Sequence, residues 1–570
     1  MQWISNRLFG QTDKQLLHKC LLLLCIGAVL VNIKSIFTDF DVDSEYAVVM
    51  SYRQLQGDAM FTQMWEPHQT SAFLITFLMW LYRAVTGTTA GIVLFLHFVG
   101  VFLWCLLTIA FYKTLKKWVD SELLLLMCVF FFAVRPKDVV LPEFSNMLIG
   151  FSVMSFCCLL QFFQHQNKRV WLVAASISLC LQILAYPSCL AVYLPVVILL
   201  GIYTDKKWSN ILLFSCCCLL IGAGYILQLV GKTGIHPLIS GISGMIRSDS
   251  SHGSIFSIGK SNSLPGFIFG WHMAIIALLA LAAGILWYLV KKGSLKEKLI
   301  FVFAAALTVI QTANAIMYSQ VFEYVLLYAV VIGMGVAGIK HCNEEEKRVY
   351  FTGLILSAGS YIAVNFLTNW HPTAVIVYLI LAVAVSFVPL SRWLEHNMSF
   401  SQKAFRWGIL LLFCLTVILR RGIMTRSMNR MAPTLFDLRG IVTAGPAAGI
   451  VTDYIGAYET RCDIEDWEKF VMPGDRLLVV DDYLPHGLVY MYQDVVISAH
   501  SVISTPTYDE KLLDYWDQNP EKVPNIIAVN CWYGDMQVSE DNWIFEYMDK
   551  EEKVYTCEDG RYWRFYRLEE

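Results

Sequence analysis

The chain has 570 residues, of which 56% are hydrophobic and 16% charged, and its formal net charge at pH 7 is −3. This composition excludes an ordinary soluble globular protein. With so small a net charge and no long basic tract, nucleic acid is excluded as a partner.

Apolar runs of about 17 to 25 residues, enough to cross about 30 Å of hydrocarbon, recur from Cys20 to about Arg420 and then stop. The lysine- and arginine-bearing loops between these runs share one side of the membrane only if residues 71–87 stay at the membrane surface. This segment is short for a span and carries Arg83. The sequence therefore predicts a mainly α protein: a polytopic transmembrane helical bundle of about 13 spans with external juxtamembrane helices. We expect a multi-pass plasma-membrane protein with a cytoplasmic N-terminus and an extracytoplasmic C-terminal domain.

The first external loop, at about residues 38–90, opens with four carboxylates in seven positions: Asp39, Asp41, Asp43 and Glu45. Such a cluster is costly unless it meets a cation or shares protons. If a helix starts at Ser44, Asp43 lies near its N-cap and Glu45 in its first turn, so helix capping explains part of the cluster. The alternative is a general base or a divalent-metal ligand set.

The same loop continues with a recognisable order of residues, namely Asp43-Ser44-Glu45-Tyr46, Leu55, Gly57, Asp58, Trp65-Glu66-Pro67-His68 and an apolar segment ending in Gly87. This order resembles the first external loop of polytopic glycosyltransferases of the C superfamily, which includes the protein O-mannosyltransferases and the aminoarabinose transferases. The resemblance implies a catalytic acid in this loop, juxtamembrane helices, and a polyprenyl-phosphate sugar donor. Family members commonly carry adjacent Asp and Glu before the tyrosine. Here Ser44 intervenes, so Asp41, Asp43 and Glu45 all stay candidates for the catalytic acid.

Further polar residues lie at the predicted outer ends of spans and are candidates for substrate binding. Arg135 and Lys137 can neutralise a phosphate, and Glu143 and Asn146 are one helical turn apart, so they can face one cleft. A sugar can be held by the Glu66 carboxylate and the His68 imidazole, which lie on either side of Pro67. It can also be held by the aromatic ring of Tyr186 at a span end. For each, an ordinary exposed turn or an interfacial aromatic belt is the alternative. Asp43, Glu45 and Glu143 are the candidate ligands if the protein uses Mg²⁺ or Mn²⁺.

The sequence divides into a transmembrane glycosyltransferase-like domain at 1–420 and an extracytoplasmic soluble α/β domain at 421–570. The second part has dense charge and short mixed runs, and it contains no GxSxG, HExxH or P-loop motif. Its aromatic residues suit a domain that covers a cavity or holds a carbohydrate acceptor.

The function predicted is transfer of a sugar from a polyprenyl-phosphate carrier to a glycan, lipid or protein acceptor outside the membrane. A transporter or flippase of a lipid-linked glycan is the first alternative, although its charged residues would lie at mid-membrane depth. The second is a non-catalytic envelope assembly protein, in which the carboxylates would point away from any cavity.

Overall fold

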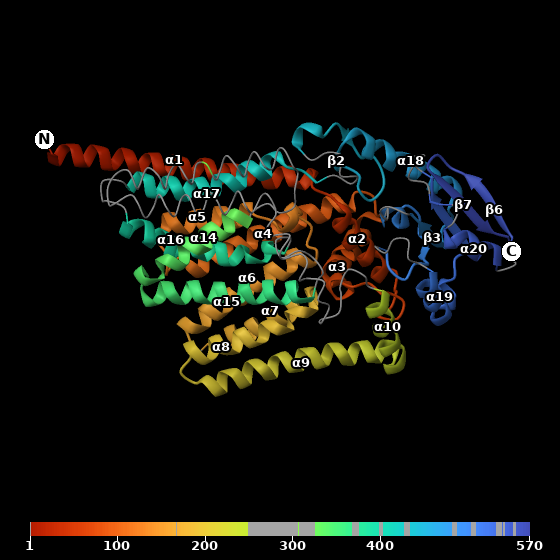
Figure 1. Cartoon of the computed structure of the whole chain (residues 1–570), viewed down its shortest axis with the longest axis horizontal. Coiled ribbons are helices and arrows are strands. Elements are labelled where there is room, and N and C mark those ends of the chain that lie inside the picture. The colour runs from red at the N-terminus through yellow and green to blue at the C-terminus, as the bar shows by residue number, and fades with distance from the viewer. Residues whose placement is uncertain are drawn as a thin grey trace.

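The computed structural model describes residues 2–166, 168–248, 306, 325–367, 375–397, 403–426, 434–481, 487–502, 509–531, 538–539, 542–550 and 554–569. Two parts follow one another along the long axis of the molecule (Figure 1): a bundle of long helices and a smaller domain with a sheet. The N-terminus lies at the far end of the bundle and the C-terminus at the opposite end of the molecule.

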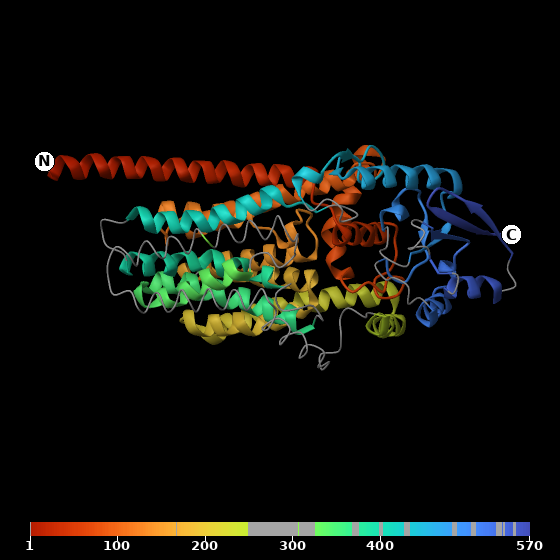
Figure 2. The ribbon, with the colours of Figure 1, turned by 45° about the horizontal axis from the view of Figure 1, so that its top comes forward.

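The helices of the bundle run roughly along this axis in both views (Figures 1 and 2). They are α1 (Gln2–Phe37), α4 (Ile92–Leu115), α5 (Ser121–Ala133), α6 (Phe144–Gln164), α7 (Val170–Ala185), α8 (Tyr193–Tyr203), α9 (Lys207–Thr233), α14 (Val325–Gly338), α15 (Glu344–Leu367), α16 (Ile380–Asn397) and α17 (Lys403–Ile423). The predicted mainly α architecture is confirmed for the described residues.

Five described helical segments are long and apolar enough to cross a membrane: Gln15–Phe37, Ile92–Leu115, Phe144–Gln164, Lys207–Thr233 and Ile376–His396. Shorter apolar helices, such as Ser121–Ala133 and Val170–Ala185, pack among them. The predicted count of about 13 spans includes segments between 249 and 324, which apart from residue 306 lie outside the described residues. The count therefore stays a prediction.

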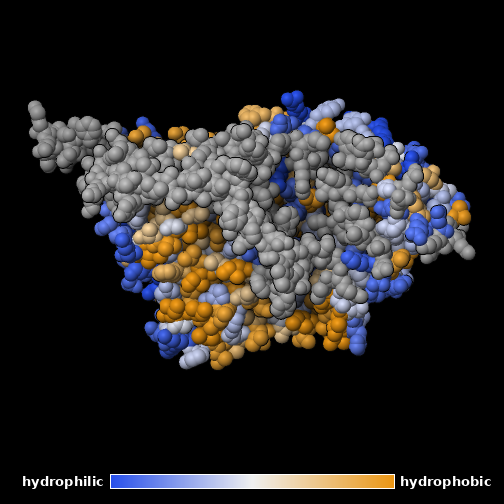
Figure 3. Space-filling view, viewed as in Figure 1, coloured by the Kyte–Doolittle hydropathy of each residue, from blue (hydrophilic) through white to orange (hydrophobic). Residues whose placement is uncertain are grey.

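The side of the bundle formed by α8 and α9 is strongly apolar. In Figure 3 hydrophobic residues form a broad zone there, and hydrophilic residues gather at the end of the bundle and over the C-terminal domain. The exposed residues of this zone include Leu194, Ile198, Ile202, Leu212, Leu219 and Leu220. A side that exposes so many large apolar residues suits lipid rather than water.

Three further helices lie between the bundle and the C-terminal domain (Figure 1): α2 (Val42–Leu55), α3 (Phe73–Thr86) and α10 (Ile235–Ser248). α3 packs beside α2 and ends at Gly87, whose φ of +71° is left-handed. Its 14 residues extend for about 21 Å at about 1.5 Å per residue, less than the about 30 Å of the hydrocarbon core. As the sequence predicts, this segment is a separate short helix, and Phe77 and Trp80 on it are each 56% exposed.

The chain leaves the bundle when α17 ends at Ile423. A short hairpin of β1 (Gly440–Ile441) and β2 (Val451–Thr452) and helix α18 (Tyr454–Phe470) lead to a five-stranded sheet. Its order is β4 (Val496–Ile497), β3 (Arg476–Val480), β5 (Ile526–Asn530), β7 (Trp563–Leu568), β6 (Tyr555–Asp559).

Within this sheet β3 is parallel to β4 and β5, and β7 is antiparallel to β5 and β6. The residues of β5 and most of those of β3 are buried, which explains their nearly continuous apolar sequences. Helices α18, α19 (Asp509–Gln518) and α20 (Trp543–Lys550) complete the domain. The predicted α/β character is confirmed, and buried apolar residues of the bundle, α2 and this domain form one continuous core.

Candidate functional site

The turn between α1 and α2 is built on Asp39, which adopts a left-handed conformation with φ of +59° and is fully buried. Lys34 on α1 places its Nζ 3.3 Å from one Asp39 oxygen. The backbone N–H of Arg426 donates to the other oxygen at 2.9 Å. Asp is among the residues that tolerate this conformation best, so contacts from α1 and from the segment after α17 fix where α2 begins.

α2 is capped by Asp41, which corrects the expectation that the helix starts at Ser44 with Asp43 near its cap. The helix begins at Val42, and an Asp41 oxygen accepts from the Ser44 N–H at 3.2 Å and from its hydroxyl at 3.1 Å. A capping side chain bonds the backbone two or three residues ahead, and Asp41 has that spacing. Arg426 Nη1 lies 3.6 Å from the other Asp41 oxygen.

Asp43 and Glu45 both lie in the first turn of α2 and point to different sides. Two residues along a helix differ by about 200° around its axis. Asp43 is half-buried and acts electrostatically on the Tyr378 hydroxyl, as does Glu143. Glu45 is buried and faces the C-terminal domain, where it acts on Tyr492.

Burial raises the pKa of Glu45 to about 8, and the neighbouring Asp41 and Asp463 add to the rise. Since a carboxyl group with this pKa is largely protonated at neutral pH, Glu45 is unsuited to accept a proton there. Of the three acids that the sequence leaves open, the chemistry therefore favours Asp43 or Asp41.

The candidate metal ligands do not assemble. No group of three or more His, Cys, Asp or Glu side chains that could hold a metal ion exists among the residues that the structure describes. Asp43 and Glu45 diverge, and Glu143 is committed to capping α6, so the expected Mg²⁺ or Mn²⁺ set of Asp43, Glu45 and Glu143 does not fit.

Glu143 and Asn146 hold the loop that precedes α6. The Glu143 carboxylate accepts from the Ser145 N–H at 2.7 Å and the Asn146 N–H at 2.8 Å, so it caps the helix. The Asn146 amide donates to the carbonyl oxygens of Val139 at 3.1 Å and Leu141 at 2.9 Å. The two side chains lie together, as their spacing predicts, and both are buried.

Two of the predicted residues, His68 and Tyr186, meet in an aromatic cluster beside this cap. The imidazole of His68 stacks on Phe144 with ring centroids 4.2 Å apart, and Tyr186 lies 4.9 Å from the same imidazole. Tyr186 also contacts Tyr378 at 6.4 Å, and the Tyr378 hydroxyl is 2.9 Å from Ser145 Oγ. His68, Tyr186 and Glu143 thus gather on the side of α2 to which Asp43 points. Tyr378 was missed because its surrounding apolar run indicates only a span.

Arg135 lies inside the bundle, and its burial there does not favour the predicted contact with a phosphate. Its guanidinium donates to Asn32 Oδ1 at 3.0 and 3.3 Å and stacks over Trp104 at 4.4 Å, and the side chain is 1% exposed. The side chain of Lys137 lies outside the described residues, so its predicted role is unchanged.

The sequence reasoning missed a group of cations at the end of α17. Arg420 and Arg421 reach Asp138 at 3.2 and 3.6 Å, and Arg426 reaches Asp41. A signal existed: Arg420 and Arg421 end the last apolar run, at the end that the predicted topology places outside, where the positive-inside bias predicts few arginines. They lie beside Asp39 and Asp41, and Arg426 is partly exposed.

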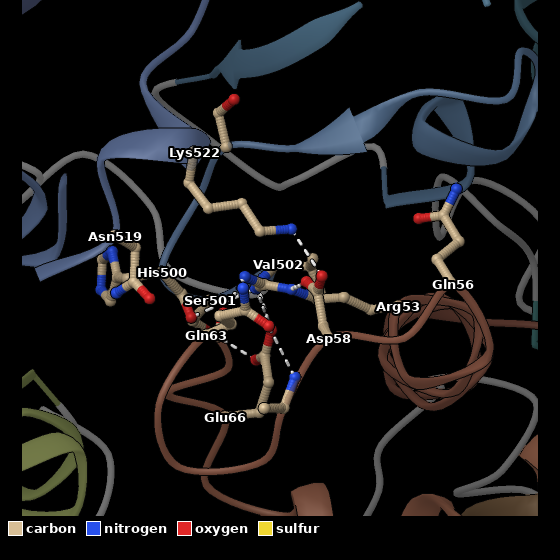
Figure 4. A network of polar contacts seen from close by, with 12 residues as sticks. Arg53, Gln56, Asp58, Gln63, Glu66, His500, Ser501, Val502, Asn519 and Lys522 are labelled. Carbon is tan, nitrogen blue, oxygen red and sulfur yellow. Dashed lines mark hydrogen bonds and ion pairs between the residues drawn. The ribbon is translucent and has the colours of Figure 1, made fainter. Parts of the chain in front are cut away.

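Glu66 lies apart from Asp43, in a network with the C-terminal domain (Figure 4). Its carboxylate accepts from Ser501 Oγ at 2.6 Å, the Val502 N–H at 2.9 Å and Arg53 Nη1 at 3.2 Å. Because these contacts bury the carboxylate completely, we do not include Glu66 in the candidate site.

No family model matches the sequence, and no curated protein matches it. The structure is similar to that of an archaeal oligosaccharyltransferase, AglB from Archaeoglobus fulgidus, in complex with an inhibitory peptide and a dolichol-phosphate. The TM-score is 0.45 at 12% identity, over 91% of this chain and 70% of that chain. A second structure of the A. fulgidus oligosaccharyltransferase, with Zn and sulfate, gives 0.45 at 11% identity, over 90% and 68%.

ArnT from Cupriavidus metallidurans in the apo state gives a TM-score of 0.44 at 13% identity, over 96% of this chain and 97% of that chain. At this level of similarity we transfer no residue's role from these proteins.

Proposed function

We propose that the protein transfers a sugar from a polyprenyl-phosphate carrier to an acceptor on the extracytoplasmic side of the membrane. The observation that carries the proposal is the placement of Asp43. This carboxylate is half-buried in the first turn of α2, between the bundle and the C-terminal domain, on the side of Glu143 and Tyr378. A base at the end of a lipid-facing bundle suits a substrate whose tail lies in the membrane and whose head group lies at its surface.

In the proposed reaction the Asp43 carboxylate takes the proton of an acceptor hydroxyl while the hydroxyl oxygen bonds to the anomeric carbon. The bond from that carbon to the phosphate oxygen breaks, and its electron pair stays with the departing phosphate. Attack opposite the phosphate inverts the anomeric configuration. We assign stabilisation of the phosphate to Arg426 and to the N-terminal amides of α2, with Lys137 as a further candidate.

The proposed topology places the N-terminus in the cytoplasm and the C-terminal domain outside. The acceptor, a glycan, lipid or protein, would then approach from the side of the C-terminal domain, and the lipid donor from the bundle. The opposite placement of the two termini supports this arrangement.

The test is transfer of label from a panel of radiolabelled polyprenyl-phosphate sugars into membranes that contain the protein or an Asp43→Asn variant. Loss of the base is expected to lower transfer by about 100-fold or more. Asp41→Asn separates capping from catalysis, because Asn caps a helix as well as Asp does; we expect a much smaller loss.

The matched control is Asp120→Asn, the same change at the N-cap position of α5, where Asp120 is exposed and lies 3.6 Å from Arg392. It should transfer sugar at the wild-type rate. Equal transfer by wild type and Asp43→Asn, or no transfer with any donor, would contradict the proposal and favour a transporter or an assembly protein.

A further inference from the structure

We infer that the C-terminal domain positions the proposed catalytic helix, through a buried network centred on Arg53. In this inference the segments 500–502 and 515–522 hold α2 and the loop after it in place for transfer. The inference rests on the proposed function for its catalytic consequence, and its structural part can be tested separately.

Arg53, in the last turn of α2, is fully buried and uses its whole guanidinium in the network (Figure 4). Nε donates to Asp58 at 2.7 Å, and Nη1 donates to Glu66 and to the His500 carbonyl, each at 3.2 Å. Nη2 donates to the Gln63 carbonyl and to the Tyr515 hydroxyl, the latter at 2.8 Å. A guanidinium has five N–H donors in a fixed fork, and all five have partners here.

Two of these partners belong to the C-terminal domain, and the other partners of Arg53 are themselves bound to that domain. Asp58 pairs with Lys522, and Glu66 accepts from Ser501 and Val502. The backbone also takes part, since the Trp65 N–H donates to the His500 carbonyl at 2.9 Å. Buried charges need both a partner of opposite sign and satisfied hydrogen bonds, and this network provides them only while the domain is in place.

α2 itself is also bound to the domain near its C-terminal end. The Tyr52 hydroxyl donates to Asp494 at 3.0 Å, and Gln56 donates to the Val495 carbonyl at 2.8 Å. At its other end the helix is fixed by the Asp41 cap and Arg426. The two anchors are about ten residues apart, or about 15 Å along the helix, so together they set its rotation and tilt.

A small rotation of α2 would move Asp43 relative to the bundle, because the carboxylate lies in the first turn of the same rigid helix. A displacement of about 1 Å in a reacting group can lower a rate about 100-fold. Arg53, Glu66, Ser501 and Tyr515 are therefore positioning residues, which act through α2 and do not touch the substrate.

The experiment compares Tyr515→Phe and Ser501→Ala, each of which removes one hydroxyl from the network, with the wild-type protein. Two quantities are measured: kcat and KM for the lipid donor, and hydrogen–deuterium exchange of the α2 amides in the full-length protein. We expect kcat to fall about tenfold or more, KM for the donor to stay within about twofold of the wild type, and exchange in α2 to rise.

The control is Arg567→Lys, which weakens an ion pair inside the C-terminal domain, where the Arg567 guanidinium donates to the Asp475 carboxylate at 2.8 and 2.9 Å. This variant should leave both kcat and α2 exchange unchanged. Unchanged exchange in α2 for both network variants would overturn the inference, as would a fall in kcat that Arg567→Lys shares.

If Asp43→Asn retains transfer, the proposed function fails. The exchange measurement still decides whether the domain orders α2, so the two failures are distinguishable.

Discussion

Four neighbouring carboxylates at the start of α2 have four different environments. Asp39 holds the turn, Asp41 caps the helix and pairs with Arg426, Asp43 faces Tyr378 and Glu143, and Glu45 faces the C-terminal domain. The sequence predicts that a catalytic acid lies among them but cannot choose one, because the choice depends on groups far along the chain.

The pKa of Glu45 gives a prediction for stability against pH. Its folded-state pKa of about 8 exceeds that of an exposed carboxyl, so the folded state keeps its proton where the unfolded state has lost it. The free energy of unfolding should therefore decrease as pH rises from about 5 to 9, by up to a few kcal/mol.

Thermal unfolding of the detergent-solubilised protein across this pH range measures the effect, with Glu45→Gln as the comparison. Gln cannot ionise, so the variant should lose much of the dependence and be the more stable protein at pH 9. Parallel curves for the two proteins would contradict the assigned pKa.

At the scale of elements, the candidate site depends on how closely α4 approaches the loop before α6. A Cβ added at Gly100 would lie 1.8 Å from the Val140 carbonyl oxygen. Because the Asn146 amide and the Glu143 cap are bonded within the same loop, any displacement of Val140 reaches them. Only glycine permits this contact.

Gly100→Ala should therefore destabilise the protein by about 1–3 kcal/mol or more and lower transfer. The matched change is Gly150→Ala on α6, where the nearest atom to an added Cβ is Leu107 Cδ2 at an ordinary 3.8 Å. Thermal unfolding midpoints measured side by side test this. Equal midpoints for the two variants would show that the loop before α6 can move without destabilising the protein.

At the scale of the whole molecule, the two termini lie at opposite ends of the long axis (Figure 1). In the topology proposed above, this axis follows the membrane normal and the two termini lie on opposite sides of the membrane. The lysine- and arginine-bearing loops between the apolar runs predict that the N-terminus is on the cytoplasmic side.

Reporter fusions check that orientation. Alkaline phosphatase, which is active only outside the cytoplasm, should be active when joined after Glu570. A fluorescent protein that matures only in the cytoplasm should be fluorescent when joined before Met1. The reverse pattern would place the proposed catalytic helix on the cytoplasmic side.

Much of the fold follows from the sequence, because the long apolar runs, the short apolar segment at 71–87 and the mixed terminal region each have a local signature. The site is less predictable. Its parts come from α2, the loop before α6, Tyr378 and the end of α17, and only tertiary packing brings them together. Glu66 is the instructive case, since its position beside Pro67 and His68 predicts a sugar ligand, whereas its partners Ser501 and Val502 are more than 400 positions away.

The network around Arg53 has a consequence for the ionic conditions that the protein tolerates. Its cations, Arg53 and Lys522, balance its anions, Asp58 and Glu66, and all four side chains are nearly free of solvent contact. Mobile ions screen exposed pairs over about 3 Å at 1 M salt but hardly reach buried ones. An exposed pair such as Lys347 with Glu344 should weaken in concentrated salt, while the junction between α2 and the C-terminal domain keeps its full strength.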